Sequence, residues 1–101
     1  MAVSKNQPQP LDDLTAFQRD LLVVVDSIDE SEVSKGLRLK GVLEDYYGEP
    51  INHGRLYPNL DDLMEKGLLS KSDVDGRTNE YRLTSRGLRE LDLHRSWVGS
   101  Q

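Results

Sequence analysis

Two turns of a predicted helix, residues 52–59, carry amide, imidazole and guanidinium groups that suit hydrogen bonding to nucleobases. The guanidinium fork of Arg55 matches O6 and N7 of guanine, and the amide of Asn59 matches N6 and N7 of adenine. Gly54 lets the backbone come close to a duplex. We therefore predict that base edges of double-stranded DNA are read by Asn52, His53, Gly54, Arg55 and Asn59. The alternative for Arg55 is an ordinary solvated charge on a helix.

A second donor-rich stretch lies around a predicted turn and is suited to phosphates or a minor groove. Its members are Lys71, Arg77, Thr78 and Asn79. Tyr57 lies about 60° from the apolar stripe of its own helix. Packing in the core and contact with a phosphate are therefore equally compatible with Tyr57.

Few residues support other kinds of chemistry. The chain has no cysteine, which excludes disulfides, thiolate metal sites and a cysteine nucleophile. His53 and His94 lie far apart and make a poor metal site. The adjacent acidic pairs are Asp12-Asp13, Glu44-Asp45 and Asp61-Asp62. Sequence neighbours point in different directions, unlike a facing catalytic pair. We predict no enzyme, no metal site and no cofactor.

The elements that position these groups follow an N-terminal arm, residues 1–12, whose two prolines and lack of apolar periodicity predict flexibility. The domain itself spans residues 13–101. Thr15 and Gln18 form a capping box, and helical spacing then predicts a first helix from about Ala16 to Asp29. Its apolar stripe is Phe17, Leu21, Val24, Val25 and Ile28.

Two more helices follow. The second lies near Lys35 to Tyr47 and ends at Gly48. Its apolar stripe is Leu39, Val42, Leu43, Tyr46 and Tyr47. Asn52 caps the third helix, which ends at Gly67. The stripe of the third helix is Leu56, Leu60, Leu63 and Met64.

The remaining segments predict a hairpin and a last helix. Leu68–Asp73 and Asn79–Thr84 flank Asp75-Gly76, a strong hairpin signal. The strand residues expected to face the core are Leu69, Tyr81 and Leu83. Thr84 caps a final helix that carries Leu88, Leu91, Leu93 and Trp97. The order predicts a mostly helical α+β fold, a winged helix-turn-helix with three helices, a two-stranded wing and a C-terminal dimerisation helix.

Residues 52–60 (Asn-His-Gly-Arg-Leu-Tyr-Pro-Asn-Leu), with Leu63 and residues 65–69 (Glu-Lys-Gly-Leu-Leu), resemble the recognition helix of PadR-like transcriptional regulators. Tyr81-Arg82-Leu83-Thr84 and Gly87 resemble the second wing strand and the start of the last helix in that family. The resemblance covers about residues 14–97. It implies a homodimer that binds an operator, with short members contacting their mate through the first and last helices. The short last helix here is similar to that of a short member.

The acidic residues of the third helix limit how it can meet DNA. Asp61, Asp62 and Glu65 lie in its later turns and would repel phosphates. We therefore expect only its first two turns to enter the major groove.

Apolar residues outside the stripes predict a second buried face. They are Leu22 and Val23 on the first helix and Leu93 and Trp97 on the last. An isologous contact between identical chains would cover them, which predicts a homodimer and a pseudo-palindromic operator. The alternative for Trp97 is exposure in a fraying tail.

The formal charge of −5 is unevenly distributed. Residues 1–50 carry five basic and ten acidic side chains, whereas residues 51–101 carry eight of each. Eleven Asp and eight Arg against five Lys are typical of proteins that stay soluble in concentrated salt, which predicts a halophilic archaeal source. An ordinary acidic bacterial protein is the alternative.

No segment suits a membrane. The longest unbroken apolar run, Leu21 to Val25, is five residues and too short to span a bilayer or to form a signal-peptide core. We therefore expect a cytoplasmic protein without a membrane partner.

The predicted function is sequence-specific DNA binding by a transcriptional regulator. Of the two modes of regulation, we predict repression. The competing interpretation is a winged helix that has lost DNA binding and serves as a protein-interaction module, since the acidic first half would suit a basic partner. Arg55 and Asn59 favour DNA. The sequence identifies no operator and no effector, although a small-molecule effector is compatible with it.

Arg77→Ala is expected to weaken binding to all DNA sequences alike. The slope of log K against log salt should fall by about one, because a phosphate contact releases about one counterion. Titration of a labelled duplex at several salt concentrations measures this slope. An unchanged slope would place Arg77 away from DNA.

Overall fold

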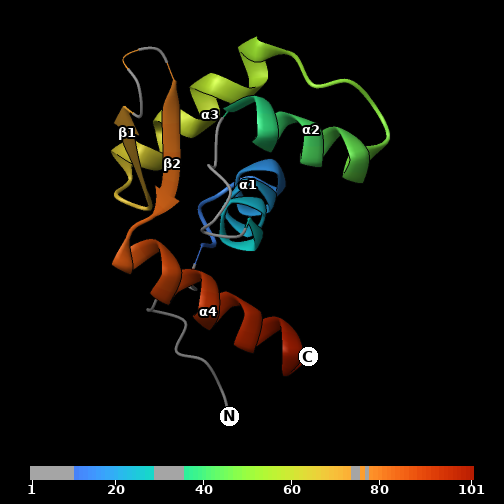
Figure 1. Cartoon of the computed structure of the whole chain (residues 1–101). Helices are drawn as coiled ribbons and strands as arrows, with labels where there is room; N and C mark the ends of the chain where they lie inside the picture. Colours follow the sequence, from blue (N-terminus) through green and yellow to red (C-terminus); the bar gives the residue numbers. More distant parts are fainter. Residues whose placement is uncertain (1–10, 29–35, 74–75, 77) are drawn as a thin grey trace.

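The computed structural model describes residues 11–28, 36–73, 76 and 78–101, the side chain of Leu37 excepted. Within these residues the elements are α1 (Ala16–Ser27), α2 (Gly36–Tyr47), α3 (His53–Glu65), β1 (Leu69–Asp73), β2 (Asn79–Leu83) and α4 (Ser85–Gly99). The predicted order of helices and strands is confirmed (Figure 1). The predicted arm falls largely on residues 1–10, which lie outside the described part.

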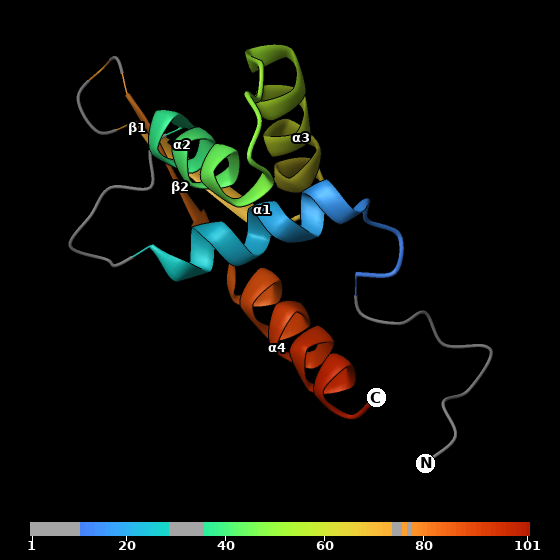
Figure 2. The same cartoon turned by 90° about the vertical axis from the view of Figure 1, so that its right-hand side faces the viewer.

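Helix α1 occupies the centre of the molecule. It packs against α2, α3, α4 and β2, and Figures 1 and 2 show α2 and α3 on one side of it and α4 on the other. Its predicted capping box is confirmed, because Thr15 Oγ1 accepts from Gln18 N and Gln18 Oε1 accepts from Thr15 N, both at 3.2 Å. The side chains predicted to face the core are buried, with Ile28 half-buried.

Leu22 corrects the prediction of a second, outward apolar face on α1. Its side chain is 0% exposed, so it belongs to the core of the single chain and is closed to a partner. The stripe assigned from helical spacing is too narrow because α1 is covered on two sides. Val23 remains 39% exposed.

The core continues into α2 and α3 as predicted, with one exception. Leu39 and Leu43 of α2 are fully buried, but Tyr46 is 73% exposed and lies off the core. The stripe of α3 is buried, with Met64 half-buried. Gly48 follows α2 with φ +71° and Gly67 follows α3 with φ +77°, left-handed conformations that favour glycine and end the helices.

The domain begins earlier than predicted. Leu11, assigned to the arm, is only 2% exposed and packs in the core. Its backbone has φ +62°, and its carbonyl and that of Leu14 accept from Arg19 Nη1 at 3.3 and 3.0 Å. Arg19 therefore holds the turn at residues 11–14 onto α1.

The hairpin β1-β2 is antiparallel and pairs Leu69 with Leu83 and Lys71 with Tyr81. Leu69 and Tyr81 are buried and Leu83 is half-buried, as predicted. Gly76, at the turn, has φ +84°, which fits the predicted hairpin signal. The base of the wing therefore belongs to the core.

Helix α4 buries only part of the apolar set that the sequence places on it. Gly87 and Leu91 are buried, whereas Leu88 is 44% exposed. The reason is a close approach at Gly87: a Cβ there would lie 2.1 Å from the carbonyl oxygen of Leu68. This approach turns Leu88 toward the surface, a feature that apolar spacing alone does not reveal.

Thr84 joins the end of α3 to the start of α4. Its Oγ1 accepts from Gly87 N at 2.9 Å, which confirms the predicted cap, and donates to the carbonyl of Gly67 at 2.6 Å. Its backbone N–H donates to the carbonyl of Leu68 at 3.1 Å. We call these residues, Gly67, Leu68, Thr84 and Gly87, the α3–α4 joint.

Within the described part of the chain, no helix combines the length and the apolar character needed to cross a bilayer.

Gly87→Ala is expected to lower the free energy of unfolding by about 3 kcal/mol, because the added methyl group would collide with the Leu68 carbonyl. Gly41→Ala is the matched control. No atom lies within 4 Å of a Cβ at that helical position, so stability should rise by about 0.5 to 1 kcal/mol. Urea unfolding of the two variants measures both effects, and equal stability would contradict the close approach.

Candidate nucleic-acid interface

The first turn of α3 is the most exposed part of this helix and carries no acidic residue. Asn52 caps it, because its side-chain oxygen accepts from Arg55 N at 2.8 Å. Asn52, His53, Gly54 and Arg55 are all exposed. Four of the five residues predicted to read bases therefore lie, exposed, at the N-terminus of α3.

The connection between α2 and α3 is fixed by Glu44. Its carboxylate accepts from the backbone N–H of Ile51 at 2.8 Å and lies 3.4 Å from Lys40 Nζ. The hydrogen bond from Ile51, helped by Lys40, lowers the pKa of Glu44. Ile51 is buried directly before the cap of α3, so this contact sets where the helix begins.

Arg55 is exposed but does not extend alone into solvent. Its guanidinium carbon lies 4.1 Å from the ring centroid of Phe17 and 5.9 Å from that of Tyr47. Such cation–π contacts are worth about 0.5 to 1 kcal/mol at an exposed site. Arg55 is therefore oriented by α1 and α2 before any partner is bound, unlike an ordinary solvated charge.

The aromatic support under Arg55 is itself fixed. The rings of Phe17 and Tyr47 stack with centroids 6.1 Å apart, and the Tyr47 hydroxyl donates to the Asp20 carboxylate. Burial, together with Asp20, raises the pKa of Tyr47 to about 12. The phenol therefore stays protonated, and its hydrogen bond intact, throughout the neutral range.

Asn59 departs from its predicted role. It is half-buried, its Oδ1 accepts from Gln18 Nε2 at 3.0 Å, and its Nδ2 donates to the carbonyl of Arg55 at 2.6 Å. Both ends of the amide are thus engaged within the protein. The prediction that Asn59 pairs with adenine does not fit this geometry, because the side chain is turned toward α1.

Tyr57 packs against the core, one of the two roles left open by its position. It is half-buried, and its ring stacks with that of His53 at 5.5 Å. A Cβ on Gly36, the first residue of α2, would lie 2.6 Å from the Tyr57 hydroxyl. Glycine at this position therefore allows α2 and α3 to approach closely.

The structure describes three of the four predicted donors of the wing. Lys71 is exposed and lies on the same face of the hairpin as its partner Tyr81. The base of the wing packs against α3 through β1. Burial raises the pKa of Tyr81, and the nearby Tyr57 and Asp61 of α3 raise it further. Asn79 is exposed and Thr78 half-buried. Arg77 lies outside the described residues.

The later turns of α3 are acidic, as expected. Asp61 and Glu65 are exposed, and Asp62 is half-buried and accepts from Gln18 Nε2 at 2.8 Å. The contact of Gln18 with α3 was not predicted from the sequence. Its only signal there is the capping box, which does not show that its amide reaches α3.

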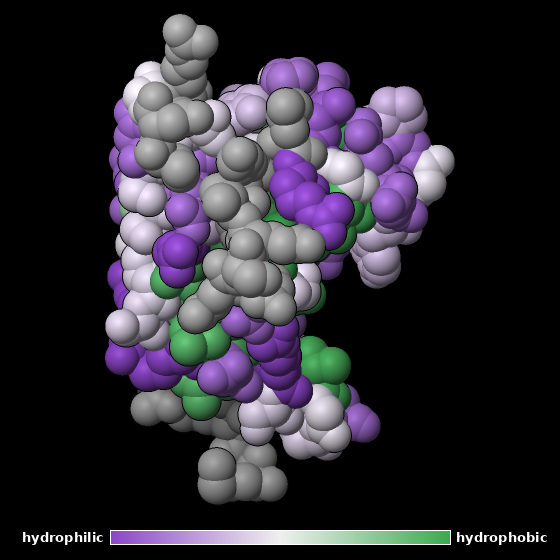
Figure 3. Space-filling model, in the orientation of Figure 1, coloured by the Kyte–Doolittle hydropathy of each residue, from purple (hydrophilic) through white to green (hydrophobic). Residues whose placement is uncertain are grey.

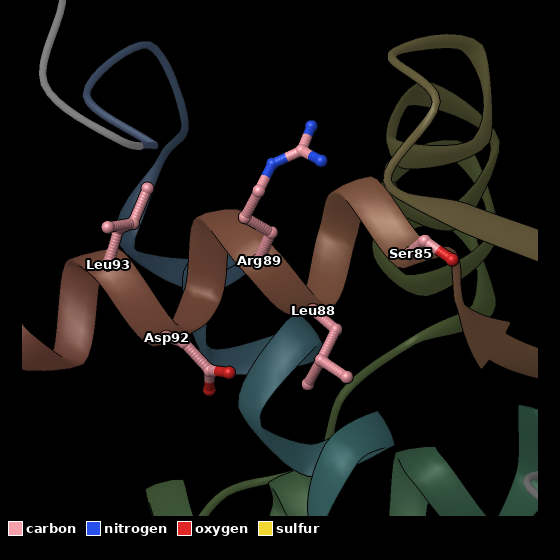
Figure 4. A pocket seen from close by; sticks show the side chains of 5 residues that line it. All are labelled: Ser85, Leu88, Arg89, Asp92 and Leu93. Carbon is pink, nitrogen blue, oxygen red and sulfur yellow. The ribbon is translucent and has the colours of Figure 1, made fainter.

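The predicted dimer residues other than Leu22 are partly exposed. Leu93 is 51% and Trp97 42% exposed on α4, and Val23 lines a hollow of about 220 Å³ between α1 and α2. A second hollow, of about 450 Å³, has only α4 residues in its lining as far as the described residues go (Figure 4). Its residues are Ser85, Leu88, Arg89, Asp92 and Leu93.

A helical unit with an exposed N-terminal half on its third helix, followed by a two-stranded wing and a packed last helix, defines a winged-helix DNA-binding domain. The model of the PadR-like transcriptional regulator family matches residues 24–93, and the chain belongs to this family. It is therefore a DNA-binding transcriptional regulator of a family whose members are regulators and not enzymes. No curated protein sequence matches the chain.

Solved structures agree with this assignment. The structure of H. salinarum RosR is 51% identical, with a TM-score of 0.80 over 89% of this chain and 78% of that chain. The complex hsRosR-S4 is 50% identical, with a TM-score of 0.82 over 90% of this chain and 76% of that one. A PadR family regulator from Eggerthella lenta is 31% identical, with a TM-score of 0.57 over 80% of this chain and 75% of that chain.

Proposed function

We propose that the chain is a homodimeric repressor that reads a pseudo-palindromic operator with the N-terminal half of α3. The observation that carries this proposal is the exposed, acid-free first turn of α3 beside acidic later turns. Phosphates repel carboxylates, so the helix enters the major groove end-on, with Arg55 at the base edges. Bound at a promoter, such a dimer represses by occupying the DNA.

The wing supplies contacts that do not depend on sequence. Lys71 and Asn79 are exposed on the hairpin, and Arg77 is adjacent in sequence to its turn. These groups suit phosphates or the minor groove beside the recognition helix. They position the domain on the duplex, while Arg55 selects the site.

The dimer rests on α4. Leu93, Trp97 and Val98 are 51%, 42% and 53% exposed, and Figure 3 shows hydrophobic surface at the end of the molecule where α4 lies. Among the described residues, those that line the larger hollow all belong to α4, and two of them, Leu88 and Leu93, are apolar and exposed. An isologous contact with a second α4 covers them. Two recognition helices then lie about 34 Å apart, one turn of DNA.

We propose that the protein binds DNA in concentrated salt. The support is the excess of Asp and Arg over Lys and the 51% identity to a protein from H. salinarum. For about five phosphate contacts, raising salt from about 0.15 to 3 M would cost about six decades of affinity by counterion release. Base contacts and shape therefore supply most of the binding, which fits a surface with few cations.

Arg55→Ala is expected to cost about 1 to 3 kcal/mol at a duplex selected from random DNA by the wild-type chain, the value of a bidentate guanine contact. Arg55→Lys is the matched control. It keeps the charge but lacks the fork, so binding to a scrambled duplex should survive while base preference is lost. Anisotropy titrations with both duplexes measure this difference.

Equal affinity of the wild-type chain for selected and scrambled duplexes would contradict base reading by α3. That result would favour the alternative of a protein-interaction module.

Leu93→Ser combined with Trp97→Ala is expected to give monomers and to lower affinity to that of a half-site, because both side chains are exposed on α4. Leu22 is left unchanged because its burial would confound the result with unfolding. Tyr46→Ala is the control, since it removes an exposed aromatic ring from α2. Sedimentation equilibrium measures the mass. A monomeric wild-type chain at micromolar concentration would exclude this dimer and its palindromic operator.

A further inference from the structure

Gln18 is the one buried polar side chain among the described residues, at 6% exposed, and all its amide atoms are engaged. Its Oε1 accepts from Thr15 N at 3.2 Å. Its Nε2 donates to Asn59 Oδ1 at 3.0 Å and to Asp62 Oδ2 at 2.8 Å. The side chain thus bridges the cap of α1 and two consecutive turns of α3.

The capping box alone does not explain why this residue is glutamine. Glutamate closes a capping box equally well, because only an acceptor oxygen is needed at this position. Glutamate has no donor, however, and cannot bond to Asn59 or to the Asp62 carboxylate. The donors of Gln18 are therefore used toward α3, separately from the cap.

The contacts of Gln18 lead to Arg55. Asn59, held by Gln18, donates to the carbonyl of Arg55 at 2.6 Å. Phe17, adjacent to Gln18 in sequence, lies under the Arg55 guanidinium at 4.1 Å. The first turn of α1 therefore fixes both the backbone and the side chain of Arg55.

The same contact orients an acidic group. Asp62 is half-buried, and its carboxylate is held by an α1 side chain, whereas Asp61 and Glu65 are exposed on the same helix. A carboxylate drawn toward α1 repels a phosphate less than one that rotates freely on the DNA side.

We propose that Gln18 is a positioning residue for DNA reading, which acts through Asn59 and Asp62 to fix the recognition helix and Arg55. The proposal rests on the proposed function, in which α3 reads the operator. Gln18 does not itself touch DNA, because it is buried between α1 and α3.

Gln18→Glu is the sharpest test, because it keeps the cap acceptor and replaces the bridging donors with a carboxylate facing Asp62. We expect about tenfold lower affinity for the selected duplex and little change for the scrambled one. Gln18→Glu with Asp62→Asn swaps donor and acceptor at residue 62 and should restore the part of the loss that this contact carries, while the bond to Asn59 stays broken. Gln18→Glu with Asp61→Asn is the matched control, since it removes the same charge from a neighbouring residue and should not restore it.

Hydrogen exchange of the free protein gives a readout that needs no DNA. The backbone amides of residues 59–63 should exchange faster in Gln18→Glu and slow again, part of the way to the wild-type rate, in the Asp62→Asn swap, but not in the Asp61→Asn control. If Gln18→Glu does not fold, the two double variants still decide. Folding that returns with Asp62→Asn but not with Asp61→Asn supports the contact between residue 18 and α3.

Three results would overturn the proposal. The first is a Gln18→Glu variant with wild-type exchange and wild-type DNA selectivity. The second is lower stability with unchanged selectivity, which would make Gln18 merely structural. The third is equal rescue by Asp61→Asn and Asp62→Asn. Equal affinity of the wild-type chain for selected and scrambled duplexes would instead refute the proposed function. The exchange data would then still decide whether Gln18 bridges α1 and α3.

Discussion

The enclosure of α1 between two layers is the constraint on which the other elements depend. Helices α2 and α3 pack on one side of it and α4 on the other, so α1 is the shared support of the reading helix and of the last helix (Figure 2). Its N-terminal turn contacts α3 through Phe17 and Gln18. Near its C-terminal end, Asp26 lies 2.7 Å from Arg95 Nη1 of α4. A displacement of α1 would therefore shift both α3 and α4.

The acidic composition is compatible with DNA binding because of where the carboxylates point. Several form ion pairs within the protein: Asp13 with Lys66, Asp26 with Arg95 and Glu80 with Arg82. Exposed pairs of this kind add about 0 to 1 kcal/mol to stability. Their larger effect is on the surface potential, because a paired carboxylate presents less negative charge to an approaching phosphate. The total charge therefore says little about the face that meets DNA.

Sequence periodicity predicted the order of elements and most of the core, since each helix has an apolar stripe and a side-chain cap that act locally. It failed where a contact from elsewhere in the chain decides burial. Leu22 is buried because α1 is covered on two sides, and Leu88 is exposed because Gly87 approaches the Leu68 carbonyl. At the candidate interface, the type and position of Arg55 predicted an exposed side chain, which the structure shows, and its contact with DNA stays a prediction. The inward turn of Asn59 was not predicted, because it depends on Gln18, which is distant in sequence.

The α3–α4 joint has a consequence for the geometry of the operator. Thr84 holds the carbonyl of Gly67 with its hydroxyl and that of Leu68 with its N–H, and Gly87 leaves no room between α4 and Leu68. The end of the recognition helix and the start of α4 therefore move as one rigid lever. In a dimer held through α4, the angle of this lever sets the helical phase between the two half-sites. A small rotation at the joint would leave the preferred bases of each half-site unchanged but would alter the number of base pairs that separates them.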